Sequence, residues 1–435
     1  MKKLLVIMLV LSLVFNLSAC GNNGTPAEGP AGDSAEKPEE KPAEEPASEE
    51  APSENAEEAS QDAEETEDAE AGDTEAPDTE EPQEEAEADP FNTEMTSLEI
   101  AAAMKAGWNL GNSLDANSAP GLAAETSWGN PKTTQELVND IHDMGFTTIR
   151  IPVSWGTHAD ENGHADEAWM ARVKEVVDYA YGIGMYVILN SHHDNDYYDI
   201  GGCTEDAAVY EASVKKMTGL WTEIAETFKG YDERLVFETM NEPRTIGSAN
   251  EWSGGTEAER KIVYGLNAAI VEAIRATGGN NTYRHIMVPC YGANAQYDIL
   301  STMELPDDDR IIVSVHAYTP YVFAMQGAGG TATFTASHKS DLDSLFRTLN
   351  VLFVKKGIPV VIGEFGCTNK DNIEDRCAWM DYYVSGAKVY GIPCIVWDNN
   401  SRRGQTGEEC FGLYERSTGE WLWPELVETM IKAAE

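Results

Sequence analysis

Two glutamates stand at the ends of apolar, strand-like runs of the chain. Glu242 lies near the end of LVFETMNEP, and Glu364 lies near the end of PVVIGEFG. A pair of carboxyl groups suits cleavage of a glycosidic bond, because one group, protonated, delivers a proton to the leaving oxygen while the other, ionised, attacks the anomeric carbon. That chemistry requires the two side chains to meet in the fold. Taken alone, either glutamate could equally be a structural acid paired with an arginine.

The elements that would position them alternate along the chain. Apolar runs rich in Val, Ile and aromatic residues, with few internal charges, are typical of strands buried on both faces. They span residues 107–112, 147–153, 186–194, 235–243, 285–292, 311–318, 359–366 and 393–399. Helical spacing of apolar residues lies between them, at 133–145, 167–184, 207–228, 257–277, 341–356, 372–390 and 424–434. The weakest helical pattern is the connection at 294–304.

This alternation predicts an α/β fold, a (β/α)8 TIM barrel over residues 91–435. The alternative is an open, doubly wound sheet, which would need a glycine-rich phosphate turn after its first strand, and GWNLGN is not such a turn. The C-terminal ends of barrel strands converge on one face, so the barrel predicts that Glu242 and Glu364 meet there.

The acidic charge is distributed unevenly along the 435 residues. The formal net charge is −46, but residues 21–90 alone hold 27 acidic side chains and two lysines. That segment has no Leu, Ile, Val, Phe, Tyr, Trp or Met, so we expect a disordered, self-repelling spacer. An acidic tail with a partner of its own is the alternative. The remaining domain is also acidic, which argues against DNA or RNA as a partner.

The N-terminus has the pattern of a targeting segment. Two lysines precede the apolar run LLVIMLVLSLVF, and Leu-Ser-Ala-Cys-Gly follows at residues 17–21. This resembles the lipobox of bacterial lipoproteins, which implies a signal peptide over 1–19, a lipidated Cys20 and a spacer over 20–90. An ordinary secretory signal is the alternative. We expect an extracytoplasmic protein held by its lipid anchor on a bacterial membrane or cell surface.

Neither a metal nor a disulfide framework is predicted. Six cysteines remain after residue 90, none of them in a CxxC pair, so free thiols are expected and one disulfide stays possible. His192, His193 and Asp194 resemble a metal cluster, but the chain has no HxxxH or HxH companion motif. We therefore predict no cofactor. We also expect the protein to be a monomer.

Eight segments in order resemble glycoside hydrolase family 5, and most closely the endo-β-1,4-glucanase and xyloglucanase branch, subfamily 4. The resemblance covers residues of about 96–432. The segments are GWNLGNSLDA, ETSWGNPKTT, TIRIPVSWGTH, YVILNSHHD, MNEPR, VSVHAYTPY, GEFG and VWDNN.

The resemblance implies roles for individual residues. Glu242 matches the family's acid/base and Glu364 its nucleophile. Arg150 matches the arginine that keeps the nucleophile ionised. Tyr318 would add a hydroxyl hydrogen bond to the same carboxylate, and His316 would support the acid/base.

The resemblance also implies contacts with sugar. Asn241 would contact the 2-hydroxyl of the sugar being cleaved, and His192 and Trp397 would line its subsite. Further candidates for sugar contact are Asn109, His193, Trp128 and Asp398. Tryptophans 108, 128, 155 and 252 fall in or near strand-to-helix connections, where an indole can stack on glucose or simply pack.

The function expected from the resemblance is retaining hydrolysis of internal β-1,4 bonds in cellulose or mixed-linkage β-glucan. Alternatives within the class are a xyloglucan-specific enzyme and a broad-specificity glucanase, mannanase or xylanase. Two alternatives of other kinds are a non-catalytic glycan-binding lipoprotein and a metal-dependent hydrolase on the same barrel.

Overall fold

The computed structural model describes residues 90–327, 329–401 and 409–435. The predicted signal peptide over 1–19 and the predicted lipidation at Cys20 lie outside these ranges, as does the predicted spacer over 20–90 except for Pro90. Among the helices in the described ranges, none combines the length and the apolar character needed to cross a membrane. Five of the cysteines in the described part of the chain are free thiols, namely Cys203, Cys290, Cys367, Cys377 and Cys394.

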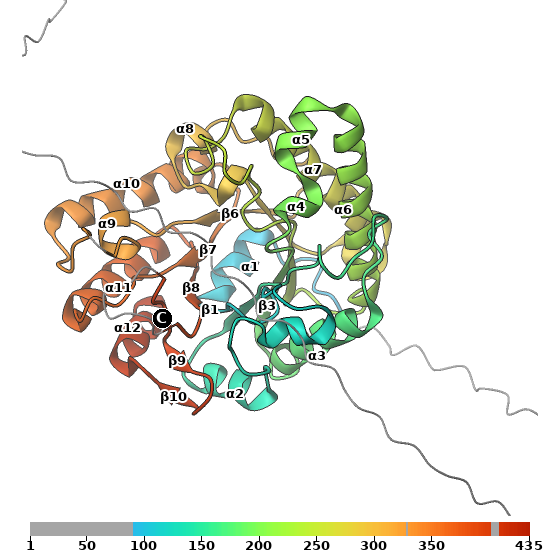
Figure 1. Ribbon diagram of the computed structural model, residues 1–435. Helices are drawn as coiled ribbons and strands as arrows, with labels where there is room; N and C mark the ends of the chain where they lie inside the picture. Colours follow the sequence, from blue (N-terminus) through green and yellow to red (C-terminus); the bar gives the residue numbers. More distant parts are fainter. Residues whose placement is uncertain (1–89, 328, 402–408) are drawn as a thin grey trace, which may run out of the picture. The chain divides into compact units, whose positions relative to one another are not determined.

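Eight parallel strands form a closed barrel in chain order, with the last strand paired to the first. The predicted (β/α)8 fold is therefore confirmed, and Figure 1 shows the helices surrounding the strands. The strands are β1 (Ala106–Leu110), β2 (Thr148–Ile151), β3 (Tyr186–Asn190), β4 (Leu235–Glu238), β5 (Ile286–Pro289), β6 (Ile311–His316), β7 (Val360–Phe365) and β8 (Cys394–Asp398). A separate two-stranded sheet pairs β9 (Tyr414–Glu415) with β10 (Glu420–Trp421).

The longer helices follow the sequence pattern closely. They are α2 (Gln135–Asp143), α3 (Glu167–Tyr181), α6 (Ala207–Thr227), α7 (Glu257–Ala276), α10 (Ala336–Leu352), α11 (Ile373–Lys388) and α12 (Pro424–Ala434). The shorter elements are α4 (Asn195–Tyr198), α5 (Ile200–Glu205), α8 (Tyr297–Leu300), α9 (Tyr321–Ala324), η1 (Gly121–Thr126), η2 (Gly279–Thr282), η3 (Tyr291–Ala293) and η4 (Val354–Lys356). Only α8 occupies the connection whose helical pattern was weakest.

One helix that the pattern did not predict, α1 (Ser97–Met104), closes the bottom of the barrel. A capping box begins it, because the Glu99 backbone N–H donates to Thr96 Oγ1 while the Thr96 N–H donates to the Glu99 carboxylate. Its buried Ile100 and Met104 pack against apolar residues inside the barrel, namely Ile188, Val236, Met287, Ile312, Val361 and Ile395. Each such buried side chain contributes about 1.5–3 kcal/mol, so α1 forms part of the core.

Above this apolar layer, the inward-facing residues are polar. Side chains alternate between the two faces of a strand, so the inward residue two positions after Val236 is Glu238, and the one two positions after Ile188 is Asn190. Together with Asn109, Arg150 and Ser314 they form a buried, hydrogen-bonded layer. The face at the C-terminal ends of the strands is therefore built on a polar floor.

An irregularity in β7 directs Glu364 toward this floor. The pairing of β6 with β7 shifts by one residue, so that Val315 pairs with Ile362 but His316 pairs with Glu364. The extra residue is Gly363, where a Cβ atom would lie 3.2 Å from Ser314 Oγ and 3.4 Å from His316 Nε2. Strict alternation after the inward Val361 would turn Glu364 outward, and the bulge turns it in.

Candidate active site

Arg150, on β2, is the centre of the site and is fully buried. Its Nε–H donates to Glu238 Oε2 at 2.7 Å. Its Nη1 donates to Asn109 Oδ1 at 2.9 Å and to Glu364 Oε1 at 2.8 Å. Its Nη2 donates to Asn241 Oδ1 at 2.7 Å. Arg150 therefore links the polar floor to the catalytic face, and its rigid fork orients several acceptors at once.

Glu364 receives hydrogen bonds on both carboxylate oxygens. Arg150 contacts Oε1, and the Tyr318 hydroxyl donates to Oε2 at 3.0 Å. Burial, with the charge of Glu242 added, outweighs the charges of His316 and Arg150 and raises the pKa of Glu364. The bonds from Arg150 and Tyr318 stabilise the ionised carboxylate and fix its direction, as a nucleophile requires.

Glu242 forms a short contact with His316. The distance from His316 Nδ1 to Glu242 Oε1 is 2.7 Å, and Arg244 Nη1 lies 3.4 Å from Glu242 Oε2. Burial opposes ionisation of Glu242, but its hydrogen bond to His316 and the charges of His316 and Arg244 prevail and lower its pKa. Burial likewise opposes the charge on His316, but Glu364 and Glu242 prevail and raise its pKa. The Glu242–His316 pair therefore shares a proton.

The two glutamates meet, as the barrel predicts. One oxygen from each carboxylate and one ring nitrogen of His316 all lie within 4.8 Å of one another. Two carboxyl groups this close, one ion-paired and the other sharing a proton, can act as nucleophile and proton donor on opposite sides of one bond.

Most of the other predicted site residues lie around this pair. Asn241 turns its Oδ1 to Arg150, which directs its amide N–H groups away from the guanidinium. The rings of His192 and Trp397 stack with centroids 5.7 Å apart and planes 4° from parallel. The exposed His193 lies against Trp128, with centroids 5.4 Å apart.

Two predicted sugar contacts, Asn109 and Asp398, do not fit the structure. Both side chains are fully buried. Asn109 is held by Arg150 and donates to the carbonyl of Gly363 at 2.9 Å. Asp398 accepts hydrogen bonds from the Trp108 indole at 3.0 Å and from backbone N–H groups of the segment after β8. Both residues therefore shape the walls of the site, beneath the surface that a sugar reaches.

Four residues of the site were not predicted from the sequence. Glu238, Asn190 and Ser314 belong to the polar floor, and Arg244 follows Glu242 by two positions. Alternation within β3 and β4 was the available signal for Asn190 and Glu238, because each lies two positions after an inward apolar residue, Ile188 and Val236 respectively.

A second group with possible metal ligands adjoins the glutamates. One atom each of Asp115, His192 and His193 lie within 4.8 Å of one another. Asp115 already accepts the backbone N–H groups of Asn112 and Ser113, at 3.0 and 2.7 Å, and burial raises its pKa to about 6. Its visible role is therefore to hold the connection after β1.

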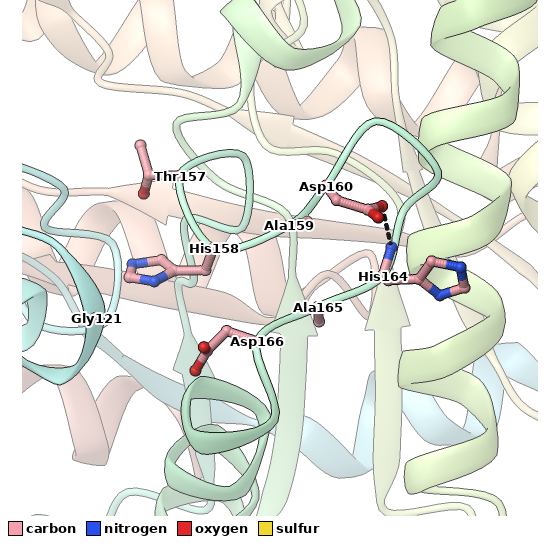
Figure 2. A pocket seen from close by; sticks show the side chains of 8 residues that line it. All are labelled: Gly121, Thr157, His158, Ala159, Asp160, His164, Ala165 and Asp166. Atoms are coloured by element: carbon pink, nitrogen blue, oxygen red, sulfur yellow. Dashed lines mark hydrogen bonds between the residues drawn. The ribbon is translucent and has the colours of Figure 1, made fainter.

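A hollow of about 380 Å³ lies between η1 and the connection from β2 to α3 (Figure 2). It is lined by Gly121, Thr157, His158, Ala159, Asp160, His164, Ala165 and Asp166. The Asp160 carboxylate accepts the His164 backbone N–H at 3.0 Å, and Asp166 accepts the Trp169 N–H at 2.8 Å at the start of α3. Both carboxylates thus serve the turns of the loop itself, and none of the lining residues is a predicted site residue.

Comparison with known proteins gives one consistent result. The model of the cellulase family, glycosyl hydrolase family 5, matches residues 114–403. Endoglucanase A of Ruminococcus albus is 42% identical over 347 residues, which cover 78% of this chain and 93% of that protein. Endoglucanase A of Clostridium longisporum is 44% identical over 348 residues, 77% of this chain, and the chain spans 65% of the length of that protein.

Solved structures agree. A GH5-4 broad specificity endoglucanase from Clostridium longisporum superposes with a TM-score of 0.74 at 42% identity, covering 78% of this chain and 98% of that one. A xyloglucan-specific endo-β-1,4-glucanase from a metagenomic library, solved with cellotriose, gives a TM-score of 0.73 at 43% identity, covering 77% and 98%.

The barrel and its facing carboxylates define a glycoside hydrolase. The chain belongs to glycosyl hydrolase family 5, the cellulase family, and the enzyme is of the endoglucanase class. This sets aside the alternative of a non-catalytic glycan-binding protein.

Proposed function

We propose that this enzyme hydrolyses internal β-1,4 bonds of β-glucans with retention of configuration, using Glu364 as nucleophile and Glu242 as acid/base. The observation that carries the proposal is the approach of the two carboxylates to within 4.8 Å. Retaining enzymes separate the pair by about 5–5.5 Å, whereas inverting enzymes need about 6.5–9.5 Å to admit a water molecule. One oxygen of each carboxylate lies within 4.8 Å of one oxygen of the other, and this close approach supports the retaining mechanism.

In the first step Glu364 attacks C1 of the sugar while the bond to the leaving oxygen breaks. The Glu242–His316 pair supplies the proton that the leaving oxygen takes up. His316 contacts Oε1 of Glu242 at 2.7 Å and Arg244 Nη1 lies 3.4 Å from Oε2, so both neighbours orient the carboxyl group that delivers it. The products are a covalent glycosyl-enzyme and a shortened glucan.

In the second step Glu242 removes a proton from water, which attacks C1 and releases the sugar from Glu364. Glu364 is uncharged while it is esterified, so the pKa of Glu242 falls at this stage and the residue changes from acid to base. Arg150 then stabilises the departing carboxylate through Oε1.

Aromatic surfaces near the glutamates support a polymeric substrate. His192 and Trp397 form one wall beside Glu364, with His192 Nε2 4.0 Å from Glu364 Oε1. In the connection from β4 to α7, Trp252 is 60% exposed and lies over Arg244, whose guanidinium carbon is 4.2 Å from the ring centroid. Since Arg244 also contacts Glu242, we assign Trp252 to the leaving-group side, where its ring can stack on glucose.

We propose unbranched and mixed-linkage glucans as the preferred substrates, and xyloglucan as the second candidate because of the xyloglucan-specific relative. The test is release of reducing sugar from barley β-glucan, carboxymethylcellulose, xyloglucan, glucomannan and xylan, with NMR of the first-formed anomer. A β-anomer is expected from retention. An initial α-anomer would overturn the mechanism, and dominance of xyloglucan would move the second candidate to first place.

We also propose that the enzyme is exported and anchored through a lipid on Cys20. The support is the lipobox-like sequence of residues 17–21. Mass spectrometry of the N-terminal peptide should find an acylated cysteine, and Cys20→Ala should release the enzyme from the membrane fraction. An unmodified Cys20 in a protein purified from membranes would refute the anchor.

A further inference from the structure

The side chain of Asn190, the last residue of β3, lies between a buried carboxylate and a ring of the active site. Its Nδ2 is 3.0 Å from Glu238 Oε2 and 3.1 Å from His192 Nδ1. Its Oδ1 accepts the backbone N–H of Val153 at 3.1 Å. Asn190 and Glu238 are fully buried, and His192 is almost so.

These partners determine which way the amide faces. A backbone N–H can only donate, so the Val153 N–H must face the amide oxygen. Glu238 accepts from the Arg150 Nε–H at 2.7 Å and from the Ser314 hydroxyl at 2.5 Å, so it is an acceptor toward Asn190 as well. The amide nitrogen therefore faces Glu238 with one hydrogen and His192 Nδ1 with the other.

The second hydrogen of the amide determines the protonation of the His192 ring. Nδ1 must present a lone pair to the N–H of Asn190, so the single proton of the neutral ring is on Nε2. Burial, and after it the charges of His193 and Arg150, hold the pKa of His192 well below its ordinary value, which keeps the ring neutral.

We propose that Asn190, itself oriented by Glu238, is a positioning residue that fixes His192 as the Nε2–H tautomer, so that the ring presents a hydrogen-bond donor to the sugar and the nucleophile. Nε2 lies 4.0 Å from Glu364 Oε1, and the ring is stacked against Trp397. The donor therefore points to the place where the reacting sugar meets Glu364. This inference rests on the proposed nucleophile, Glu364.

The Nε2–H tautomer of His192 also determines whether this residue can bind a metal ion together with Asp115 and His193. A metal ion needs a lone pair on the coordinating nitrogen. The proton inferred on Nε2 of His192 occupies that lone pair, and moving the proton to Nδ1 would set it against the amide N–H of Asn190. The arrangement is thus built for donation to an oxygen.

The first test measures the tautomer of His192 in the unsubstituted protein. Long-range 1H–15N correlation on the full-length enzyme labelled with 15N-histidine distinguishes the protonated ring nitrogen from the unprotonated one. The chain has eight histidines, and the His192 signals are assigned by their absence from the His192→Gln variant. We expect Nε2 protonated and Nδ1 not. A proton on Nδ1, or on both nitrogens, would overturn the proposal.

The second test reverses the tautomer. The double variant Asn190→Asp, Glu238→Gln moves the carboxylate from position 238 to position 190 and keeps the charge around Arg150 unchanged. The introduced carboxylate accepts where the amide of Asn190 donates, so we expect the proton of His192 to move to Nδ1. The exposed substitution Glu136→Gln is the matched control and should change neither tautomer nor kinetics.

Reversal removes one donor from the reacting site, so we expect kcat/KM on β-glucan to fall about 10- to 100-fold. A folded double variant that keeps Nε2–H would overturn the role of Asn190. A reversed tautomer with unchanged kcat/KM would overturn the role of the donor. Full activity in Glu364→Ala would instead refute the proposed nucleophile and leave the tautomer result standing.

Discussion

Because Glu242 is the proposed proton donor and Glu364 the proposed nucleophile, the activity of the variant Glu242→Ala should depend on the leaving group of the substrate. The sugar hydroxyl released from a polysaccharide is a poor leaving group that must be protonated. A dinitrophenyl cellobioside instead releases a stable phenolate, which needs no proton. Proton donation contributes a factor of about 10²–10⁴, or about 3–5 kcal/mol of barrier. The variant should lose this whole contribution, because the Glu242 carboxyl group, which His316 and Arg244 orient, is the proposed proton donor.

We therefore expect kcat/KM of Glu242→Ala to fall about 10²–10⁴-fold on β-glucan and less than about 10-fold on the aryl glycoside. On the aryl substrate kcat falls as well, since no base activates water in the second step, and the glycosyl-enzyme accumulates. Azide, which needs no base, should enter the vacated space and restore turnover as the β-glycosyl azide.

Glu242→Gln is the matched control for that experiment. It should show the same leaving-group dependence but weaker rescue by azide, because the amide fills the space. Equal losses on the two substrates, or an α-glycosyl azide as product, would refute the assignment of Glu242.

Three further outcomes are expected. Glu364→Ala should lose nearly all activity on every substrate, the exposed Glu205→Gln serving as control; turnover within about tenfold of wild type would disprove its role. Trp252→Ala should raise KM on polysaccharide about 3- to 10-fold with less effect on short aryl glycosides, because a stacking surface beside Arg244 is lost; a uniform fall in kcat would contradict that. Burial lowers the pKa of His285 from 6.5 to about 3. Below pH 6.5 the unfolded chain therefore binds a proton at His285 that the folded protein does not bind. This group should lower the free energy of unfolding by about 1.4 kcal/mol for each unit that the pH falls from 6.5 to 3. Urea titrations at pH 7, 6 and 5 should show a flatter profile for His285→Gln, and parallel profiles would refute the shift.

The sequence predicts the barrel well because its strands are long apolar runs and its main helices have clear periodicity. The pattern of α1 is too short for such a signal, since its eight residues include three consecutive alanines. Its position follows from packing against Ile188, Val236 and other interior residues far away in the sequence, which no local pattern reveals.

The candidate site was predictable where a residue lies at the end of a strand and is exposed to the catalytic face. Asn109 and Asp398 also lie at strand ends, but they face the interior. Local sequence does not distinguish these two cases, because the register between strands decides which layer a residue enters. The inward direction of Glu364 depends on the bulge at Gly363, which again is a property of the pairing of two strands.

The start of the described chain has a mechanical consequence. Residues 92–95 are fixed at the N-terminal ends of the strands: the Asn92 N–H donates to Glu233 just before β4, and Arg310 just before β6 donates to the carbonyls of Thr93 and Met95. Any pull on the chain that precedes residue 90 is therefore borne by α1 and the bottom of the barrel. The glutamates lie at the opposite ends of the strands, so a load applied from that side enters the barrel at the end away from the carboxylate pair.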